Sequence, residues 1–254
     1  EELAAVAAGL GLALMGIGAG FPEYVDRDGR LASHEVLAWT DQPRDLLADI
    51  APTTVDSDVR CAARGEAAVG AAQGLDDYAF VIVGTGLSYA LVEAGSIRAG
   101  ARGEAIGLGE LEVSRLVDPG TTLTLERYAS GEGIRRRYRE ATGFEVDGAA
   151  EVFARAEDHD AVAAVVVETA ARALGTGLAT LASLLDPGAF VIGGGVSRAG
   201  RRWQSAMEES YHGRAGVRPA PPPLRWAELA SDAGVIGAAL THRDHSPNVS
   251  EEAS

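Results

Sequence analysis

The sequence predicts an α/β protein made of two lobes with a nucleotide cleft between them, and three observations lead to this prediction. Short apolar segments of strand length alternate with longer alanine- and leucine-rich segments of helical pattern. Glycine clusters directly follow two of the apolar segments, at residues 84–86 and 193–195. The chain has 254 residues, of which 46% are hydrophobic, so it is long and apolar enough to bury a core.

The first 80 residues are predicted to contain strands and helices in alternation. Asp41 and Pro43 indicate a short helix, with Asp41 as N-cap, because Asp caps free N–H groups and Pro is tolerated in the first turn. An alanine-rich helix is expected to begin directly after Asp58. In order, the expected elements are the end of a helix at 1–8, a strand at 11–18, a helix at 41–50, a strand at 53–55 and a helix at 59–73.

The rest of the chain begins with two strands joined by the glycines of residues 84–86. Because a strand and not a helix follows these glycines, the pattern disfavours a Rossmann dinucleotide fold. The helix at 123–140 is expected to present a solvated face of four arginines: Arg135, Arg136, Arg137 and Arg139. In order, the expected elements are strands at 80–83 and 89–93, a glycine-rich loop at 95–109, helices at 123–140 and 160–185, a strand at 190–192, a helix from about 197, a proline-rich connector at 216–223, a helix at 231–241 and a polar, frayed tail at 242–254.

Charge and composition exclude several classes of function. The chain has 22 basic and 37 acidic residues, a net charge of −15, which disfavours binding to nucleic acid and to anionic membranes. All the basic residues are Arg, so a lysine Schiff base and a Walker-type lysine are excluded. The single cysteine, Cys61, excludes an internal disulfide and suits a reducing cytoplasm. Gly, Glu and Asp interrupt the apolar stretches, so no transmembrane run of 18 residues is expected.

The glycine clusters and Asp58 each have two interpretations. The glycines are required either by a tight hairpin and a strand-to-helix turn alone, or by phosphate and adenine groups that approach backbone N–H groups at strand ends. Two glycine clusters that lie far apart in the sequence suit a nucleotide that is bound from two sides. Asp58 stands between a strand and a helix, where it acts either as an N-cap or as the general base that accepts a hydroxyl proton during phosphoryl transfer.

Six segments stand in one order over about residues 11–241. They are GIGAGFPEYVDRDG, VDSDVRCAARGEA, VIVGTGLSYALVEAGSIRAGARGEAIGLGEL, LERYASGEGIRR, VIGGGVSRAG and SDAGVIGAAL. Together they resemble the ROK family (repressors, open reading frames and sugar kinases) of the actin/hexokinase-like superfamily.

This resemblance implies a two-lobed actin/hexokinase-like (ribonuclease H-like) fold with a central nucleotide cleft. It implies ATP and Mg²⁺ as cofactors, a small sugar or polyol as the other ligand, a homodimer and a cytoplasmic location. The segment VDSDVRCAARGEA resembles the family's catalytic segment, and this resemblance implies that Asp58 is the catalytic residue. The implied nucleotide-binding residues are Gly84, Thr85, Gly86, Gly193, Gly194 and Gly195, and the implied substrate-binding residues are Glu35, Ser57 and Glu126.

The chain departs from the family pattern at several positions. The family's first phosphate motif, DxGGT, does not occur among the 254 residues, whose abrupt start favours a longer protein. Leu108 replaces the zinc-binding His of the family and the cysteines of that site are missing, so no structural zinc is expected and packing and turn bonds should hold the loop at 117–125. At sugar-contacting positions, Ser57 replaces Asn, Ala105 replaces Glu, and Glu35 aligns with another Asn. Tyr89 replaces a glycine and either crowds a phosphate or points into the core.

The favoured function is ATP-dependent phosphorylation of a hydroxyl on a sugar or sugar-like polyol. The rewritten sugar contacts favour a non-standard hexose or a cyclitol. The alternative is a non-catalytic sugar-binding or regulatory protein on the same fold. The expected division is an N-terminal lobe at 1–80, rejoined by the C-terminal helix, a larger lobe at 81–241 that carries the adenosine-side motif, and the tail at 242–254.

Overall fold

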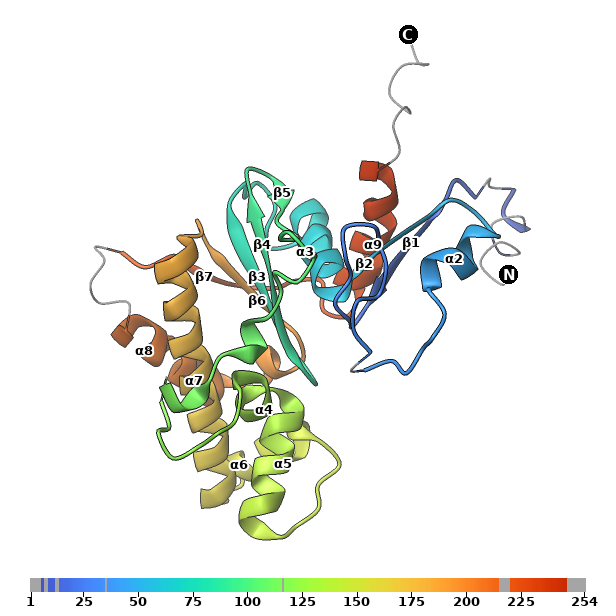
Figure 1. Ribbon diagram of the computed structural model, residues 1–254. Coiled ribbons are helices and arrows are strands. Elements are labelled where there is room, and N and C mark those ends of the chain that lie inside the picture. The colour runs from blue at the N-terminus through green and yellow to red at the C-terminus, as the bar shows by residue number, and fades with distance from the viewer. Residues whose placement is uncertain are drawn as a thin grey trace.

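A five-stranded mixed sheet forms the centre of the molecule (Figure 1). The computed structural model describes residues 6, 9–11, 14–34, 36–115, 117–214 and 220–245. The strand order is β5-β4-β3-β6-β7, where β3 is Tyr78–Val83, β4 is Leu87–Glu93, β5 is Ser96–Ile97, β6 is Phe190–Gly193 and β7 is Leu224–Trp226. β3 pairs antiparallel with β4 and parallel with β6. The predicted α/β class and the predicted hairpin are confirmed, whereas the short edge strand β7 was not predicted.

Helices cover both faces of this sheet because its central strand is apolar on both sides. In β3, Ala79, Val81 and Val83 belong to one hydrophobic cluster, which is built with the helices that follow the hairpin. Tyr78 and Phe80 point the other way and belong to a second cluster with the first turns of α3 (Asp58–Val69). Successive side chains of a strand alternate between faces, so one strand joins both cores.

A second, two-stranded parallel sheet is formed by β1 (Ile17–Phe21) and β2 (Thr53–Ser57). β1 begins six residues later than the predicted strand at 11–18, because pairing begins at Ile17 opposite Thr53 and periodicity alone does not locate that pairing. The short helix α2 (Pro43–Ala48) has Gln42 and not Asp41 at its N-cap. The Gln42 side chain is used elsewhere, since its Oε1 accepts the N–H of Leu31 at 2.8 Å.

The last helix, α9 (Asp232–His245), packs on α3 and β1 and so joins the C-terminal end of the chain to its first part (Figure 1). The helices touch through small residues. A Cβ on Gly237 would lie 1.6 Å from the carbonyl oxygen of Cys61, and one on Gly65 would lie 2.3 Å from that of Ala233. The predicted helix at 231–241 is confirmed, but residues 242–245 continue it rather than fraying. The division into lobes at residue 80 stays a prediction.

Helices α4 to α8 form the layer on the other face of the large sheet (Figure 1). They are α4 (Leu125–Ala129), α5 (Gly131–Thr142), α6 (Ala149–Glu157), α7 (Ala161–Leu185) and α8 (Arg201–Arg214). The long helix predicted at 160–185 is confirmed, with Asp160 as its N-cap. The helix expected from about 197 starts as a 3₁₀ turn, Val196–Arg198, and α6 was missed. Predicted features at 1–8, 216–223 and 246–254 fall wholly or largely outside the described residues.

The helix predicted at 123–140 is two helices, which meet at Ser130. Ser130 caps α5 by accepting the N–H of Gly133 at 3.1 Å. The first N–H groups of α5 bond to the hairpin, from Gly131 to the carbonyl of Gly84 at 2.7 Å and from Glu132 to that of Thr85 at 3.2 Å. A tertiary contact therefore breaks a pattern that is continuous in the sequence.

One of the four arginines predicted on the solvated face, Arg137, is half-buried against α4 and α7. The Arg137 guanidinium is 3.5 Å from the centre of the Tyr128 ring and donates to Thr169 Oγ1 at 2.8 Å. Burial lowers the pKa of Arg137 from its usual value. Arg135 instead makes an ion pair with Glu132 at 2.7 Å, as a surface residue does. The prediction is therefore wrong for Arg137, because charge spacing does not reveal an aromatic neighbour.

One described helix, α7, is long and apolar enough to cross a membrane by length and composition alone. No such run was expected, since Glu168 and Gly175 interrupt its apolar residues. Of its most apolar 18-residue window, 61% is buried inside the protein, in contact with α4, α5, α6 and α8. This is the position of a core helix, and it makes the hydropathy of α7 weak evidence for a membrane span.

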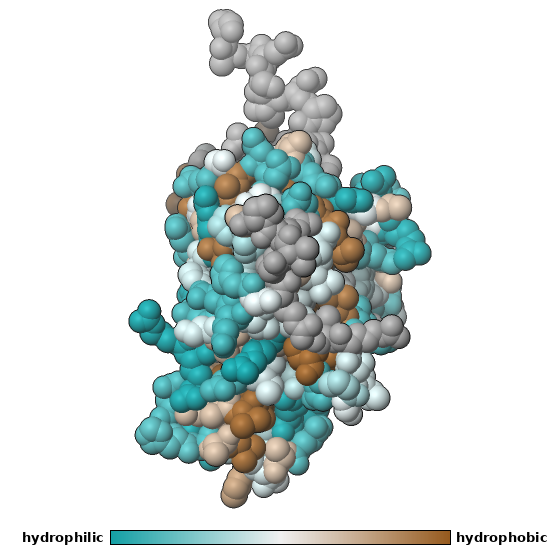
Figure 2. Space-filling view, turned by 90° about the vertical axis from the view of Figure 1, so that its left-hand side faces the viewer, coloured by the Kyte–Doolittle hydropathy of each residue, from teal (hydrophilic) through white to brown (hydrophobic). Residues whose placement is uncertain are grey.

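The face drawn in Figure 2 shows apolar groups scattered among hydrophilic ones.

Candidate active site

A cavity of about 380 Å³ opens between the first turn of α3 and the β3–β4 hairpin. Three further segments close it: the chain after β1, the segment before and within the 3₁₀ turn Leu108–Glu110, and α4. The lining residues are Pro22, Glu23, Tyr24, Ser33, Val36, Asp58, Ile82, Gly84, Thr85, Gly86, Leu87, Ser88, Ile106, Gly107, Gly109, Glu110 and Glu126. The cavity thus brings together Asp58, the first glycine cluster and Glu126, which are far apart in the sequence.

Asp58 is the first residue of α3 and follows directly on β2. Ser57 occupies the N-cap position, yet its side chain makes no capping bond. Asp58 Oδ1 accepts the N–H of Val59 at 2.7 Å, so one carboxylate oxygen does satisfy a free helix N–H. Burial raises the pKa of Asp58, and the Val59 hydrogen bond offsets only part of this rise. A carboxylate with a raised pKa at the wall of a cavity is a stronger base than an exposed one.

The two glycine clusters leave the sheet at the same edge. They follow β3 and β6, which are adjacent parallel strands with Ile82 opposite Gly193. Gly194 has a φ of +89°, and a Cβ there would lie 2.3 Å from the Val83 carbonyl oxygen. This position therefore requires glycine, whatever binds nearby. Gly84–Gly86 line the cavity, whereas Gly193–Gly195 lie outside its lining.

The backbone at both turns is open, as a nucleotide site requires. A Cβ built on Gly84 or on Gly195 would meet no atom within 4 Å. Backbone N–H groups at strand ends and helix starts are suited to bind phosphate oxygens. Tyr89 does not obstruct the hairpin, because it packs against the main core and does not line the cavity. The residues present thus fit a nucleotide along this edge.

Two of the three predicted substrate-binding residues are described. Glu126 lines the cavity, and its Oε2 accepts the N–H of Leu87 at 2.8 Å, which fixes the carboxylate beside the hairpin. Ser57 is fully buried, is not among the lining residues, and its Oγ has no hydrogen-bond partner within the described part of the chain. Glu35 lies outside the described residues. The roles of all three stay predictions.

The sequence interpretation missed Glu23 as a residue of this site. Glu23 is 5% exposed, yet it lines the cavity. Its Oε1 accepts the N–H groups of Val36 at 2.8 Å and Leu37 at 2.6 Å, and its Oε2 accepts the hydroxyl of Ser33. The carboxylate therefore holds the 33–37 segment against the cavity. The only signal in the sequence was a charged residue directly after Pro22 in an otherwise turn-like segment.

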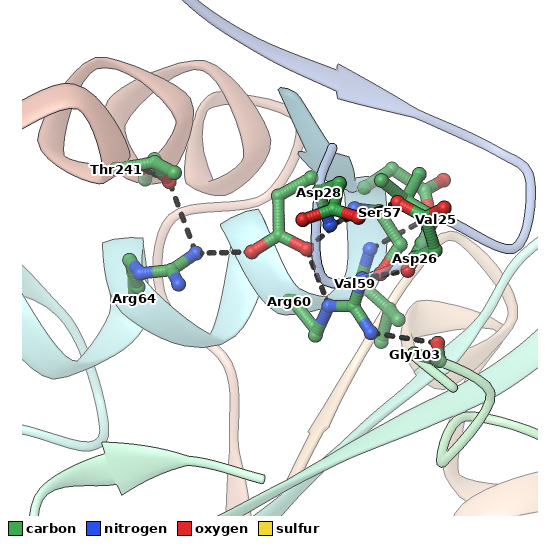
Figure 3. Close-up of polar contacts among 12 residues, drawn as sticks. Val25, Asp26, Asp28, Ser57, Val59, Arg60, Arg64, Gly103 and Thr241 are labelled. Atoms are coloured by element: carbon green, nitrogen blue, oxygen red, sulfur yellow. Dashed lines mark hydrogen bonds and ion pairs between the residues drawn. The ribbon is translucent and has the colours of Figure 1, made fainter. Parts of the chain in front are cut away.

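A buried ion network braces the strand and helix that carry Asp58 (Figure 3). Asp56, at the end of β2, binds both Arg60 and Arg64 on α3, the latter at 2.7 Å. Arg60 also donates to the carbonyls of Val25 at 2.7 Å and Gly103 at 2.8 Å, as the dashed lines in Figure 3 show. Arg64 additionally reaches Thr241 of α9 at 3.0 Å. The network thus links α3 to β2, to the chain at Val25, to the loop at Gly103 and to α9. These contacts hold the junction of β2 and α3, which carries Asp58, in place.

The loop at 117–125 is held by the turn bonds that the sequence predicts. Asp118 Oδ1 accepts the N–H of Gly120 at 3.1 Å, and Asp118 Oδ2 accepts the hydroxyl of Tyr128 at 3.2 Å. Within the described ranges, no three His, Cys, Asp or Glu side chains are grouped so that they could hold a metal ion. Leu108, at the position of the family's histidine, is buried in the core. The absence of a structural zinc stays a prediction.

The fold and the cavity define a class of protein: an α/β protein of the actin/hexokinase-like kind, with the glycine turn Gly84–Gly86 and the acidic residue Asp58 at the wall of one cavity. A ROK family model matches residues 2–245. The chain belongs to the ROK family, and the resemblance drawn from its six segments is confirmed.

Solved structures and a curated relative agree with this assignment. The chain is 35% identical over 246 residues to a glucokinase of Halalkalibacterium halodurans, covering 88% of this chain and 74% of that protein. A ROK hexokinase from Thermus thermophilus matches with a TM-score of 0.81 and 34% identity, covering 92% of this chain and 81% of the other. A ROK family glucokinase from Streptomyces griseus, in complex with glucose and AMPPNP, matches with a TM-score of 0.78 and 30% identity, covering 96% and 86%.

Proposed function

We propose that this protein transfers a phosphoryl group from ATP to a hydroxyl of a sugar or sugar-like polyol. The observation that carries the proposal is the position of Asp58, which lines the same cavity as the hairpin Gly84–Gly86. Relatives named glucokinase and hexokinase, together with a related structure that holds glucose and AMPPNP, support the same reaction.

One set of residues in this chain would bind the nucleotide, and another would bind the acceptor. Bound ATP with Mg²⁺ would supply the transferable phosphoryl group and neutralise its charge. The backbone at Gly84–Gly86 and Gly193–Gly195 would hold the nucleotide along the sheet edge, where Gly84 and Gly195 leave open space. Asp58 would accept a hydrogen bond from the acceptor hydroxyl, orient that oxygen and take its proton. Glu126 would hold a second hydroxyl of the substrate.

A non-standard hexose or a cyclitol remains the favoured acceptor. Leu108 is 2% exposed and belongs to the core, so the position of the family histidine offers no polar contact to a sugar. Ala105 does not line the cavity, whereas Ile106 and Ser88 do. A site with different hydrogen-bonding groups rejects a substrate whose hydroxyls it cannot satisfy.

A transfer assay with a substrate panel tests the proposal. Purified protein is incubated with ATP, Mg²⁺ and each of a set of hexoses, aminohexoses and cyclitols, and product is identified by mass spectrometry and phosphorus NMR. We expect one or more phosphorylated products and release of ADP that depends on the acceptor. Tight binding of a sugar without any transfer would favour the non-catalytic alternative. Light scattering on the same sample tests the homodimer, which family membership supports.

A further inference from the structure

One buried carboxylate outside the cavity takes no part in the mechanism above. Glu66, on α3, is fully buried and does not line the cavity. Its Oε2 accepts the N–H groups of Ala71 at 2.8 Å and Glu228 at 3.2 Å, and its Oε1 accepts the N–H of Leu229 at 2.9 Å. Backbone N–H groups thus supply the hydrogen bonds that a buried carboxylate needs.

The partners at residues 228 and 229 belong to the connection between β7 and α9. This connection starts on the large sheet, where the N–H of Ala227 donates to the carbonyl of Ile192 at 2.9 Å. Ile192 directly precedes Gly193, the first residue of the second glycine cluster. A Cβ on Gly193 would lie 3.1 Å from Ala227 Cβ, so the connection packs against that turn. Residues 227–229 therefore join the glycine turn to the carboxylate of Glu66.

The chain is strained directly after these hydrogen bonds. Ala230 has a φ of +53°, in the left-handed region that a residue with a Cβ rarely adopts. Such a conformation persists only where the surrounding structure fixes the chain, and the bonds from Glu66 to the preceding residues do so. Gly70 leaves room for the carboxylate, because a Cβ there would lie 2.2 Å from Glu66 Oε2.

Helix α3 carries Asp58 at its first residue and Glu66 eight positions later. The two residues are therefore about 12 Å apart along the helix axis. The hydrogen bonds within α3 keep the helix stiff over this length, so the position of Glu66 determines that of Asp58. α3 is also held on β3, where the hydroxyl of Tyr78 donates to the carbonyl of Ala63 at 2.8 Å. Glu66 adds hydrogen bonds to the β7–α9 connection, beside α9 (Figure 1).

Resting on the phosphoryl-transfer function proposed above, we propose that Glu66 is a positioning residue for that reaction. Its carboxylate fixes α3 to the connection 227–229 and so sets the position of Asp58 relative to a nucleotide at residues 193–195. A misplacement of about 1 Å between reacting groups lowers the rate of transfer by about 100-fold. A carboxylate suits this place because it only accepts hydrogen bonds, whereas an amide would turn its own N–H groups toward N–H donors.

Two variants displace the same carboxylate in different ways. Glu66→Gln replaces one acceptor oxygen by an NH₂ group, and Gly70→Ala places a Cβ 2.2 Å from Oε2 without a change of charge. In both, hydrogen exchange at the amides of residues 228 and 229 should become at least about tenfold faster. The kcat for the preferred acceptor of the substrate panel should fall at least about tenfold. The Kd values for that acceptor and for a non-hydrolysable ATP analogue should change less than about threefold, since each half of the site stays intact.

Asp160→Ala is the matched control for a purely structural role. Asp160 also accepts two backbone N–H groups, those of Val162 at 2.9 Å and Ala163 at 3.0 Å, but it caps α7 and does not line the cavity. The control should lower the melting temperature, as Glu66→Gln does, and keep kcat within about twofold of the wild type. Kinetics are measured at a temperature at which circular dichroism shows each variant to be folded.

Three outcomes would overturn the positioning role: an unchanged kcat in folded Glu66→Gln and Gly70→Ala, a change confined to the Kd values, or an equal loss of kcat in Asp160→Ala. If Glu66→Gln does not fold, Gly70→Ala alone decides. Failure of the underlying reaction is recognised in the wild type. A wild type that phosphorylates no acceptor of the panel refutes the proposed function and, with it, the role in transfer. Wild-type transfer with full kcat in the variants refutes only the role of Glu66.

Discussion

Replacing Asp58 by Asn should abolish most of the catalytic activity without harming the fold. The Asn side chain has the same shape and keeps an oxygen that accepts the Val59 N–H, which Asp58 Oδ1 accepts at 2.7 Å. It cannot accept the proton of the acceptor hydroxyl. General base catalysis contributes at least about 100-fold, so kcat should fall by that factor or more, equal to about 2.7 kcal/mol of transition-state stabilisation.

The stability of Asp58→Asn should depend on pH in a defined direction. Burial raises the pKa of Asp58 in the folded protein above its unfolded value, so ionisation of this carboxyl destabilises the fold. The contribution that favours folding is complete below the unfolded pKa and is lost as pH rises through the folded pKa. Asn does not titrate, so the variant should become more stable relative to the wild type across that window. At neutral pH it should be equal or more stable, within about 1 kcal/mol.

Steady-state kinetics on the preferred acceptor and denaturant unfolding at acid and neutral pH measure both effects. Asp232→Asn is the matched control, because Asp232 is also the first residue of a helix, α9, and is exposed away from the cavity. The control should keep full kcat. Equal turnover in Asp58→Asn and wild type, with a loss of stability instead, would refute the role as general base and leave only a helix-capping role.

Three further results are expected. Arg60→Met removes one partner of a buried ion network, so urea unfolding should show a loss of about 3–5 kcal/mol, whereas Arg102→Met, at an exposed pair, should change stability by less than about 1 kcal/mol. Gly194→Ala places a Cβ 2.3 Å from a carbonyl oxygen at φ +89° and should lower the melting temperature, whereas Gly195→Ala meets open space and should fold normally but bind a non-hydrolysable ATP analogue less tightly. Elemental analysis should find no zinc bound to the chain, and one tightly held zinc per chain would contradict the expectation drawn from Cys61 and Leu108.

Much of the fold follows from local patterns, and the sequence reveals these directly. The hairpin around Gly84–Gly86 was predicted because two apolar segments of strand length are separated by a turn that glycine suits. The helix α7 was predicted because a sustained apolar period ends at the stop signal of Asp186, Pro187 and Gly188. Each of these signals acts between residues close together in the chain.

Features set by distant partners were not predictable in this way. The helical pattern at 123–140 is continuous in the sequence, yet the helix is interrupted at Ser130. The interruption occurs because the Gly131 N–H bonds to the Gly84 carbonyl, 47 positions earlier. Arg137 has the same local pattern as its arginine neighbours, and its half-buried position is set by the Tyr128 ring and Thr169, which lie on other helices.

The same contrast applies to the candidate site. Asp58 and the two glycine clusters were singled out from the sequence as candidates, because strand ends followed by glycine or by a helix start are visible as local patterns, and of these Asp58 and Gly84–Gly86 line the cavity. Glu126 was predicted too, but only as what the family resemblance implies. Glu23 and Glu110 were not predicted as parts of this site, since they come from separate segments that meet Asp58 only when the first segment folds over the hairpin. The sequence by itself determined the strands, helices and turns that carry the site. Only the tertiary structure decided which carboxylates share one cavity, because burial and hydrogen-bond saturation arise from contacts between distant parts of the chain.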